Sequence, residues 1–188
     1  MTTHRRRHLP EGSYPENQSE ALRQMEEWET RYPTRPESFV SGVAPHAGWV
    51  FSGALAFAVI RQLPSDVETV VVIGGHLPPG GETLMAVEDV YDTPFGELPA
   101  DIELRDWMRA AVSPGADRLP DNTVEVHLPI VRHLFPNARC LSLRCPPSSR
   151  STEVGAALAE YAETKRQTIA VVGSTDLTHY GPDYGFEP

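Results

Sequence analysis

Hydrophobic and polar positions along the chain follow two patterns, and the order of these patterns predicts the fold. Residues 68–73 and 168–173 are runs rich in β-branched residues, as expected for strands buried on both faces of a parallel sheet. Apolar residues spaced three or four apart predict helices elsewhere. The predicted helices cover residues 17–31, 52–63, 101–112, 129–134 and 151–164. Ser151 is the predicted N-cap of the last of these helices. Further strands are predicted over residues 39–44, 84–90, 124–127 and 140–143.

Strands that alternate with helices in this way indicate an α/β fold. We expect a three-layer sandwich with helices on both faces of a central sheet that is mainly parallel or mixed. A chain of 188 residues, of which 40% are hydrophobic, is long enough for one domain with a substantial core. Residues 1–16 are rich in basic residues, Pro and Gly, so the sequence predicts a flexible N-terminal arm before one domain over residues 17–188.

Charge and composition exclude several classes of partner. The net charge is −10, which argues against binding to nucleic acid or to an acidic membrane surface, because both attract basic proteins. No apolar run approaches the ~20 residues that span a bilayer, and the basic start leads into Pro10 and Glu11 rather than into an apolar signal segment.

The two cysteines predict the redox environment. Cys140 and Cys145 are five positions apart in or just after a predicted strand, so alternation would place them on opposite faces. We therefore expect buried thiols rather than a disulfide, which fits a reducing cytoplasm.

Three predicted strands lead into candidate chemistry. His46 lies in the turn Pro-His-Ala-Gly, His76 follows two glycines, and Asp176 and His179 follow the last predicted strand. Ligands of open α/β sheets bind beyond the carboxyl ends of the strands, and imidazole suits both metal binding and proton transfer near neutral pH. The pattern predicts either a metal site of two histidines and a carboxylate or a metal-free acid–base site.

Each of these residues also has a structural interpretation. His46 would cap the following helix, His76 would be an exposed loop residue, and Asp176 would be an N-cap beside a surface histidine. Glu125 and His127 lie in the predicted strand 124–127, where alternation would turn one toward the cleft and the other away. A buried structural role for Glu125 fits its position as well as a catalytic role.

Several common catalytic motifs are absent from the sequence. It has no Gly-x-Gly-x-x-Gly after the first predicted strand and no Walker loop, which disfavours the standard forms of nucleotide binding. It has no Gly-x-Ser-x-Gly elbow, and it has neither His-Glu-x-x-His nor paired Cys-x-x-Cys motifs for zinc.

Taken in order, six segments resemble motifs of the Memo family, which includes the proteins called AmmeMemoRadiSam system protein B. They are residues 10–15 (PEGSYP), 45–53 (PHAGWVFSG), 75–76 (GH), 92–101 (DTPFGELPAD), 124–129 (VEVHLP) and 174–180 (STDLTHY). The resemblance implies a fold like that of class III extradiol dioxygenases. It also implies a cleft in which His46 and His76 bind iron or copper, and an oxidoreductase in which Asp176, His127 or His179 acts as acid or base.

The chain departs from the family pattern in three places. Thr178 stands where some members carry a cysteine ligand, so His179 or Asp176 would have to supply the third ligand. Asp121 and Asn122 replace a Glu-His pair. The family normally continues beyond the position of Pro188, so we expect a second chain or an oligomer to complete the fold.

These departures leave two alternatives to a metal enzyme open. The first is a non-enzymatic protein that binds a peptide or a small molecule in the same cleft. The second is a metal-free enzyme that uses the histidines alone.

Overall fold

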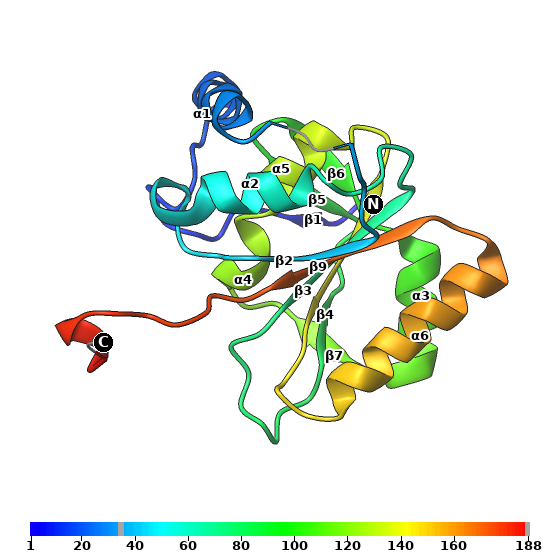
Figure 1. Ribbon diagram of the computed structural model, residues 1–188. Helices are drawn as coiled ribbons and strands as arrows, with labels where there is room; N and C mark the ends of the chain where they lie inside the picture. Colours follow the sequence, from blue (N-terminus) through cyan, green and yellow to red (C-terminus); the bar gives the residue numbers. More distant parts are fainter. Residues whose placement is uncertain (34–35, 187–188) are drawn as a thin grey trace.

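The computed structural model describes residues 1–33 and 36–186, and its centre is a six-stranded mixed sheet (Figure 1). The strands lie in the order β2 (Ser41–Ala44), β9 (Ile169–Ser174), β3 (Thr69–Gly74), β8 (Arg139–Arg144), β4 (Leu84–Ala86) and β7 (Gly115–Asp117). All neighbours pair in parallel except β4 and β8, which are antiparallel. The prediction of an α/β fold with a mainly parallel sheet is confirmed.

Helices cover both faces of the sheet. One layer holds α1 (Gln18–Arg31), α2 (Ala54–Ile60) and α5 (Leu128–Leu134), and the other holds α3 (Ile102–Val112) and α6 (Arg150–Lys165) (Figure 1). Strand β3 joins the two cores, because Val70 and Val72 belong to one buried cluster and Val71 to the other. This alternation explains why β3 is a continuous apolar run.

A second, three-stranded sheet was not predicted from the sequence. It consists of β1 (His4–Arg5), β5 (Val90–Thr93) and β6 (Gly96–Pro99), with β5 in the middle. The predicted strand 84–90 is therefore split between two sheets. The segment that the sequence indicated as a mobile arm lies against the domain, and Arg5 is only 6% exposed.

Two other local predictions were wrong. Residues 124–127 are not extended: α4 (Asn122–Glu125) forms there, because the side chain of Asp121 accepts a hydrogen bond from the Thr123 backbone N–H and caps the helix. Alternation therefore does not apply to Glu125 and His127, and both are buried. Helix α6 begins one residue before Ser151, with Ser149 at the N-cap position.

Short irregular turns connect the elements near the candidate site. The π-helical turn η1 (Trp49–Gly53) precedes α2, which is shorter than predicted, and the 3-10 turn η2 (Pro182–Tyr184) follows β9. The prediction of unpaired thiols is confirmed, since both cysteines are free and buried. No helix in residues 1–33 and 36–186 is long and apolar enough to cross a bilayer.

Candidate functional site

The carboxyl ends of three neighbouring strands bring the candidate residues together. His46 lies two residues after β2, His76 two residues after β3, and Asp176 two residues after β9. The rings of His46 and His76 are nearly perpendicular, with centroids 5.0 Å apart. His46 is buried, at 6% exposure, whereas the side chain of His76 is about half exposed at 51%. The pair therefore lies at the boundary between the core and the solvent.

Asp176 fixes the backbone at His46 and faces its ring. Its Oδ1 accepts a hydrogen bond of 2.8 Å from the His46 backbone N–H, and its Oδ2 lies 3.8 Å from Nε2 of His46. Burial tends to raise the pKa of Asp176, but the His46 N–H and the nearby imidazoles of His46 and His179 outweigh it and lower that pKa. Asp176 is thus a carboxylate at neutral pH, aimed at a ring nitrogen.

A buried hydroxyl links His46 to a second imidazole. The Oγ atom of Ser174 lies 3.1 Å from Nδ1 of His46 and 2.9 Å from Nε2 of His127. His127 is fully buried, which lowers its pKa to about 3 and keeps it neutral. Burial also lowers the pKa of His46, against the opposing charge of Asp176. Both imidazoles therefore favour the neutral form, in which one ring nitrogen donates and the other accepts.

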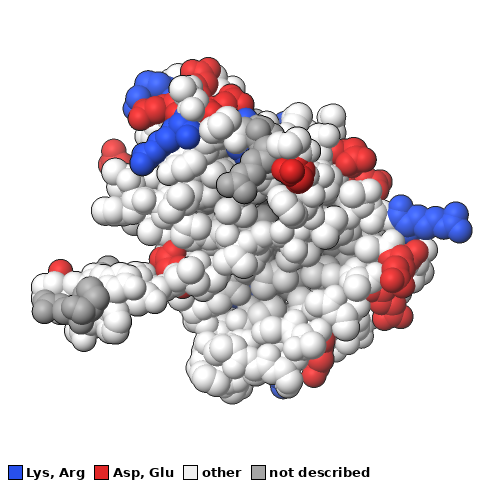
Figure 2. All heavy atoms as spheres, in the orientation of Figure 1, with Lys and Arg blue, Asp and Glu red and all other residues white. Residues whose placement is uncertain are grey.

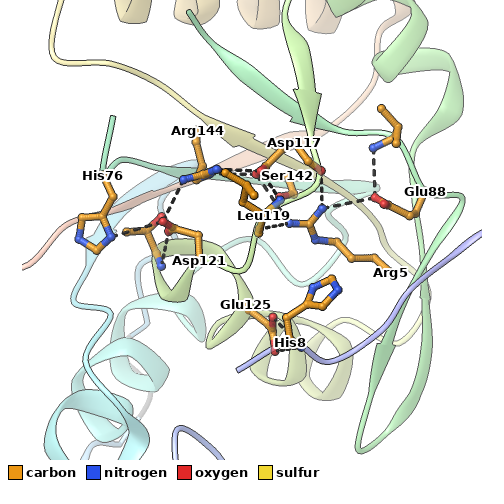
Figure 3. A network of polar contacts seen from close by, with 12 residues as sticks. Arg5, His8, His76, Glu88, Asp117, Leu119, Asp121, Glu125, Ser142 and Arg144 are labelled. Carbon is orange, nitrogen blue, oxygen red and sulfur yellow. Dashed lines mark hydrogen bonds and ion pairs between the residues drawn. The ribbon is translucent and has the colours of Figure 1, made fainter. Parts of the chain in front are cut away.

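His76 is held from the other side by a network of charged residues (Figure 3). Its Nδ1 lies 3.4 Å from Oδ2 of Asp121, and Arg144 donates to that same oxygen at 2.9 Å. Arg144 also binds Asp117 in bidentate fashion, at 2.8 and 2.9 Å. The backbone at His76 has a φ of 58°, a left-handed conformation that is uncommon outside glycine. Such a position is typical of a functional turn held by its surroundings.

The network reaches the N-terminal segment. Arg5 donates to the carbonyl oxygens of Asp117 at 2.6 Å and Leu119 at 3.0 Å, and it lies 3.4 Å from Glu88. Figure 3 shows Arg5, Asp117, Arg144, Asp121 and His76 in succession across the domain. A residue from strand β1 is thus connected through hydrogen bonds and ion pairs to the candidate site.

Comparison with known families agrees with the motifs. The family model described as Memo-like protein matches residues 5–188, which is nearly the whole chain. The chain belongs to the Memo family.

A MEMO1 family protein of Archaeoglobus fulgidus is one relative of this Memo chain. The two sequences are 30% identical over 176 residues, and this alignment covers 90% of this chain and 66% of that protein. MEMO1 family proteins of Thermococcus onnurineus and Methanococcoides burtonii are 31% and 29% identical, over 79% and 78% of this chain. The chain spans only 55% and 57% of the lengths of these two relatives.

The structure separates the predicted Memo site residues into three groups. His46, His76 and Asp176 converge at the strand ends. His127 lies behind Ser174 and is fully buried, so it does not reach the open side of the site. His179 lies on that open side, with Nε2 3.4 Å from Oδ2 of Asp176 and its side chain 52% exposed.

Glu125 has a structural role. Its carboxylate accepts hydrogen bonds from the backbone N–H groups of His8 and Leu9 and from the hydroxyl of Tyr14. These contacts hold the N-terminal segment against the domain. The partners of the Glu125 carboxylate are thus in the N-terminal segment and not at the strand ends.

Sequence reasoning missed the residues that orient the histidines. Ser174 and Asp121 contact the Nδ1 atoms of His46 and His76, and Asn122 donates to the His46 carbonyl oxygen at 3.0 Å. Ser174 lies inside a quoted motif segment, and Asp121 and Asn122 are the pair that departs from the family pattern. Their contacts with the histidines join residues far apart in the sequence, so the sequence alone did not indicate them.

In residues 1–33 and 36–186, His4, Asp92 and Glu97 form the one group of three metal-binding side chains with mutually close ligand atoms. This group lies on the second sheet and is mostly exposed. At the strand ends, the ligand atoms of His46, His76 and Asp176 do not reach this mutual distance. A metal bound there by all three would require at least one side chain to move.

Proposed function

We propose that the chain binds an iron(II) or copper ion through His46 and His76, in a domain with the fold of class III extradiol dioxygenases. The observation that carries the proposal concerns the two Nδ1 atoms. Ser174 contacts Nδ1 of His46, and Asp121 lies 3.4 Å from Nδ1 of His76. Metal-binding histidines characteristically engage one ring nitrogen in this way and leave the other for the metal.

Asp176 is our candidate for the third ligand in place of Thr178. Two atoms bound to one metal at about 2.1 Å lie no more than about 4.2 Å apart. The distance of 3.8 Å between His46 Nε2 and Asp176 Oδ2 is within that limit. Two imidazoles and one carboxylate are also the ligand set of non-haem iron oxygenases, whereas a threonine hydroxyl is a poor ligand for iron or copper.

The proposed activity is that of an oxidoreductase on a small molecule at the strand ends. When bound, iron or copper would supply the chemistry that activates dioxygen. The chain itself would keep Asp176 ionised, hold His46 neutral and orient both rings. His179, on the open side and 3.4 Å from Asp176, is the residue we propose for proton transfer to or from a substrate. His127 would act through Ser174 as a positioning residue.

A second function is favoured by the surface beside the site. Leu177 and Tyr180 flank His179 and are 82% and 59% exposed. Exposed apolar side chains next to a polar cleft fit a protein that binds a peptide without chemistry. In that case peptide binding would survive removal of the metal and the substitution of His46.

Metal analysis distinguishes these functions. The protein would be purified without chelator, loaded with Fe(II) under anaerobic conditions or with Cu(II), and analysed for metal content. We expect one equivalent of metal, lost in His46→Ala and in His76→Ala. His4→Ala is the control, because it removes the exposed cluster of His4, Asp92 and Glu97 and leaves the strand ends intact.

Two results would contradict the proposed metal site. The first is metal content that depends on His4 and is unaffected by His46→Ala. The second is a protein that stays free of metal after loading. Turnover that persists in the metal-free protein would support the acid–base enzyme instead.

A further inference from the structure

Arg144 is a buried arginine at the carboxyl end of a central strand. Figure 2 shows that the acidic and basic side chains visible on one face of the molecule lie mainly around its margin. The side chain of Arg144, in contrast, is only 4% exposed. Charged side chains are rarely buried in this way unless they are paired, so the partners of this guanidinium indicate its role.

Strand pairing places Arg144 beside the turn that carries His76. Arg144 is the last residue of β8 and pairs with Gly74, the last residue of β3, and His76 follows Gly74 by two positions. Asp121, at the N-cap of α4, contacts the side chains of both Arg144 and His76 (Figure 3). The arginine and the histidine are therefore linked through one carboxylate.

The carboxylate of Asp121 is held from two directions. Its Oδ1 accepts a hydrogen bond of 2.9 Å from the Thr123 backbone N–H, and its Oδ2 accepts one of 2.9 Å from Nη1 of Arg144. Nδ1 of His76 lies 3.4 Å from the same Oδ2, which is long for a hydrogen bond. The contacts to Thr123 and Arg144 are the shorter ones, so they, rather than His76, set the position of the carboxylate.

Asp117 in turn fixes the guanidinium of Arg144. The Nε and Nη2 atoms of Arg144 donate to the two carboxylate oxygens of Asp117 at 2.9 and 2.8 Å, a bidentate geometry that orients the guanidinium plane. Nη1 is then the atom that binds Asp121. A single planar group thus joins the two carboxylates and fixes one relative to the other.

The ring of His76 depends on this support, because its side chain is 51% exposed. The contacts that orient it are the ion pair with Asp121 and the nearly perpendicular packing against the His46 ring, with centroids 5.0 Å apart. We propose that Arg144 is a positioning residue of the site at the strand ends: through Asp121 it holds Nδ1 of His76 and leaves Nε2 for a metal ion. This role rests on the proposed function, which supplies the metal, but the orientation of the ring can be measured without metal.

Arg144→Lys tests the role and keeps a positive charge between the two carboxylates. The lysine ammonium group lacks the planar fork that binds Asp117 and Asp121 together. We expect binding of Fe(II), measured anaerobically, and of Cu(II) to weaken at least about tenfold, as when other partners of metal-binding histidines are lost. In NMR spectra of the metal-free variant, the nuclear Overhauser effects between the rings of His46 and His76 should be lost.

Arg5→Met is the matched control for the loss of a buried arginine contact. Arg5 is also buried and also binds Asp117, and its other hydrogen bonds and ion pairs in the described residues are with Glu88 and Leu119 rather than with Asp121. This variant should keep the metal affinity and the ring contact of the unsubstituted chain, even though it destabilises the domain. Urea unfolding would verify that both variants are folded under the conditions of measurement.

A double-mutant cycle tests whether Arg144 acts through Asp121. Asp121→Asn removes the charge that Arg144 binds but retains a residue type that caps helices well. Arg144→Lys should weaken metal binding in the unsubstituted chain and have little further effect in the Asp121→Asn background. Equal effects in the two backgrounds would overturn the role, because Arg144 would then act independently of Asp121.

The role of Arg144 and the proposed function can fail separately. An Arg144→Lys variant with the ring contact and metal affinity of the unsubstituted chain would overturn the role of Arg144. Equal losses in Arg5→Met would also overturn it, since they would indicate a general effect of lower stability. A chain that binds no metal, and in which Arg144→Lys still abolishes the ring contact, would contradict the proposed function and support the positioning of His76 by Arg144.

Discussion

The hydroxyl of Ser174 lies 2.9 Å from Nε2 of the buried His127 and 3.1 Å from Nδ1 of His46. A hydroxyl has one hydrogen to donate, so the three groups fix one another's proton positions. If His46 is to bind a metal through Nε2, its Nδ1 must carry the hydrogen and donate to Ser174. Ser174 then donates to His127. The distances accommodate the tautomer that a metal ligand needs.

Removal of this hydroxyl should weaken metal binding. We expect Ser174→Ala to reduce affinity by about 10-fold to 100-fold, as is typical when a partner of a metal-binding histidine is lost. Nitrogen-15 NMR of the imidazoles should show loss of the Nδ1-protonated form of His46 in the metal-free variant. Ser142→Ala is the matched control, because Ser142 is also a buried strand serine, and its hydroxyl has no partner among the described residues. Equal effects of the two substitutions would contradict this role.

The buried His127 should make stability depend on pH. Its pKa is about 3 in the folded protein and about 6.5 in an unfolded chain. Below pH 6.5 the unfolded state binds a proton that the folded state does not, so the free energy of unfolding falls as the pH falls. The loss attributable to His127 should be about 2 kcal/mol between pH 6.5 and pH 5.

Urea unfolding with a chelator present, at a series of pH values, measures this loss. His127→Gln should flatten the dependence below pH 6.5. His133→Gln should flatten it less, because His133 is only half-buried, although burial lowers its pKa too. A slope unchanged by His127→Gln would show that His127 takes up protons in the folded state.

The central sheet could be predicted because its signal is local. The β-branched run that becomes β3 and the periodic apolar positions of α1 and α3 correspond to elements within two residues of their predicted bounds. Residues 4–5 and 90–99 could not be assigned in the same way. Strand β1 has two residues, and its pairing with β5 depends on Arg5 reaching partners more than 80 positions away.

The charged start of the chain provides a test of that long-range contact. Arg5 is buried and binds the carbonyl oxygen of Asp117, whereas the adjacent Arg6 is exposed. We expect Arg5→Met to lower the free energy of unfolding by about 3 kcal/mol, because it removes one member of a buried charged network. Arg6→Met should change it by less than about 0.5 kcal/mol. Chemical denaturation of the two variants measures the difference, and equal stabilities would mean that the segment does not stabilise the domain.

The candidate site could be predicted only in part for a related reason. His46, His76 and Asp176 were identifiable because each follows a strand, and parallel strands bring their carboxyl ends together. The position of His127 depended on whether residues 124–127 are extended or helical. The Asp121 side chain caps α4 and so favours a helix over residues 122–125. The strand prediction did not allow for this cap. Contacts such as Arg144 with Asp121 join segments whose proximity only the folded sheet creates.

The packing of α4 against β3 should determine where His76 lies. A methyl group added at Gly74 would meet the Thr123 side chain, with its Cβ only 2.8 Å away, and Thr123 Oγ1 accepts from the Gly75 N–H at 3.2 Å. Gly74→Ala should therefore displace α4 and lower the free energy of unfolding by about 1–3 kcal/mol. It should also weaken metal binding, because Asp121 at the N-cap of α4 would move relative to His76. Gly75→Ala is the control, since an added methyl group there has no neighbour within 4 Å. If both variants keep the stability and metal affinity of the unsubstituted chain, the packing of α4 does not set the position of His76.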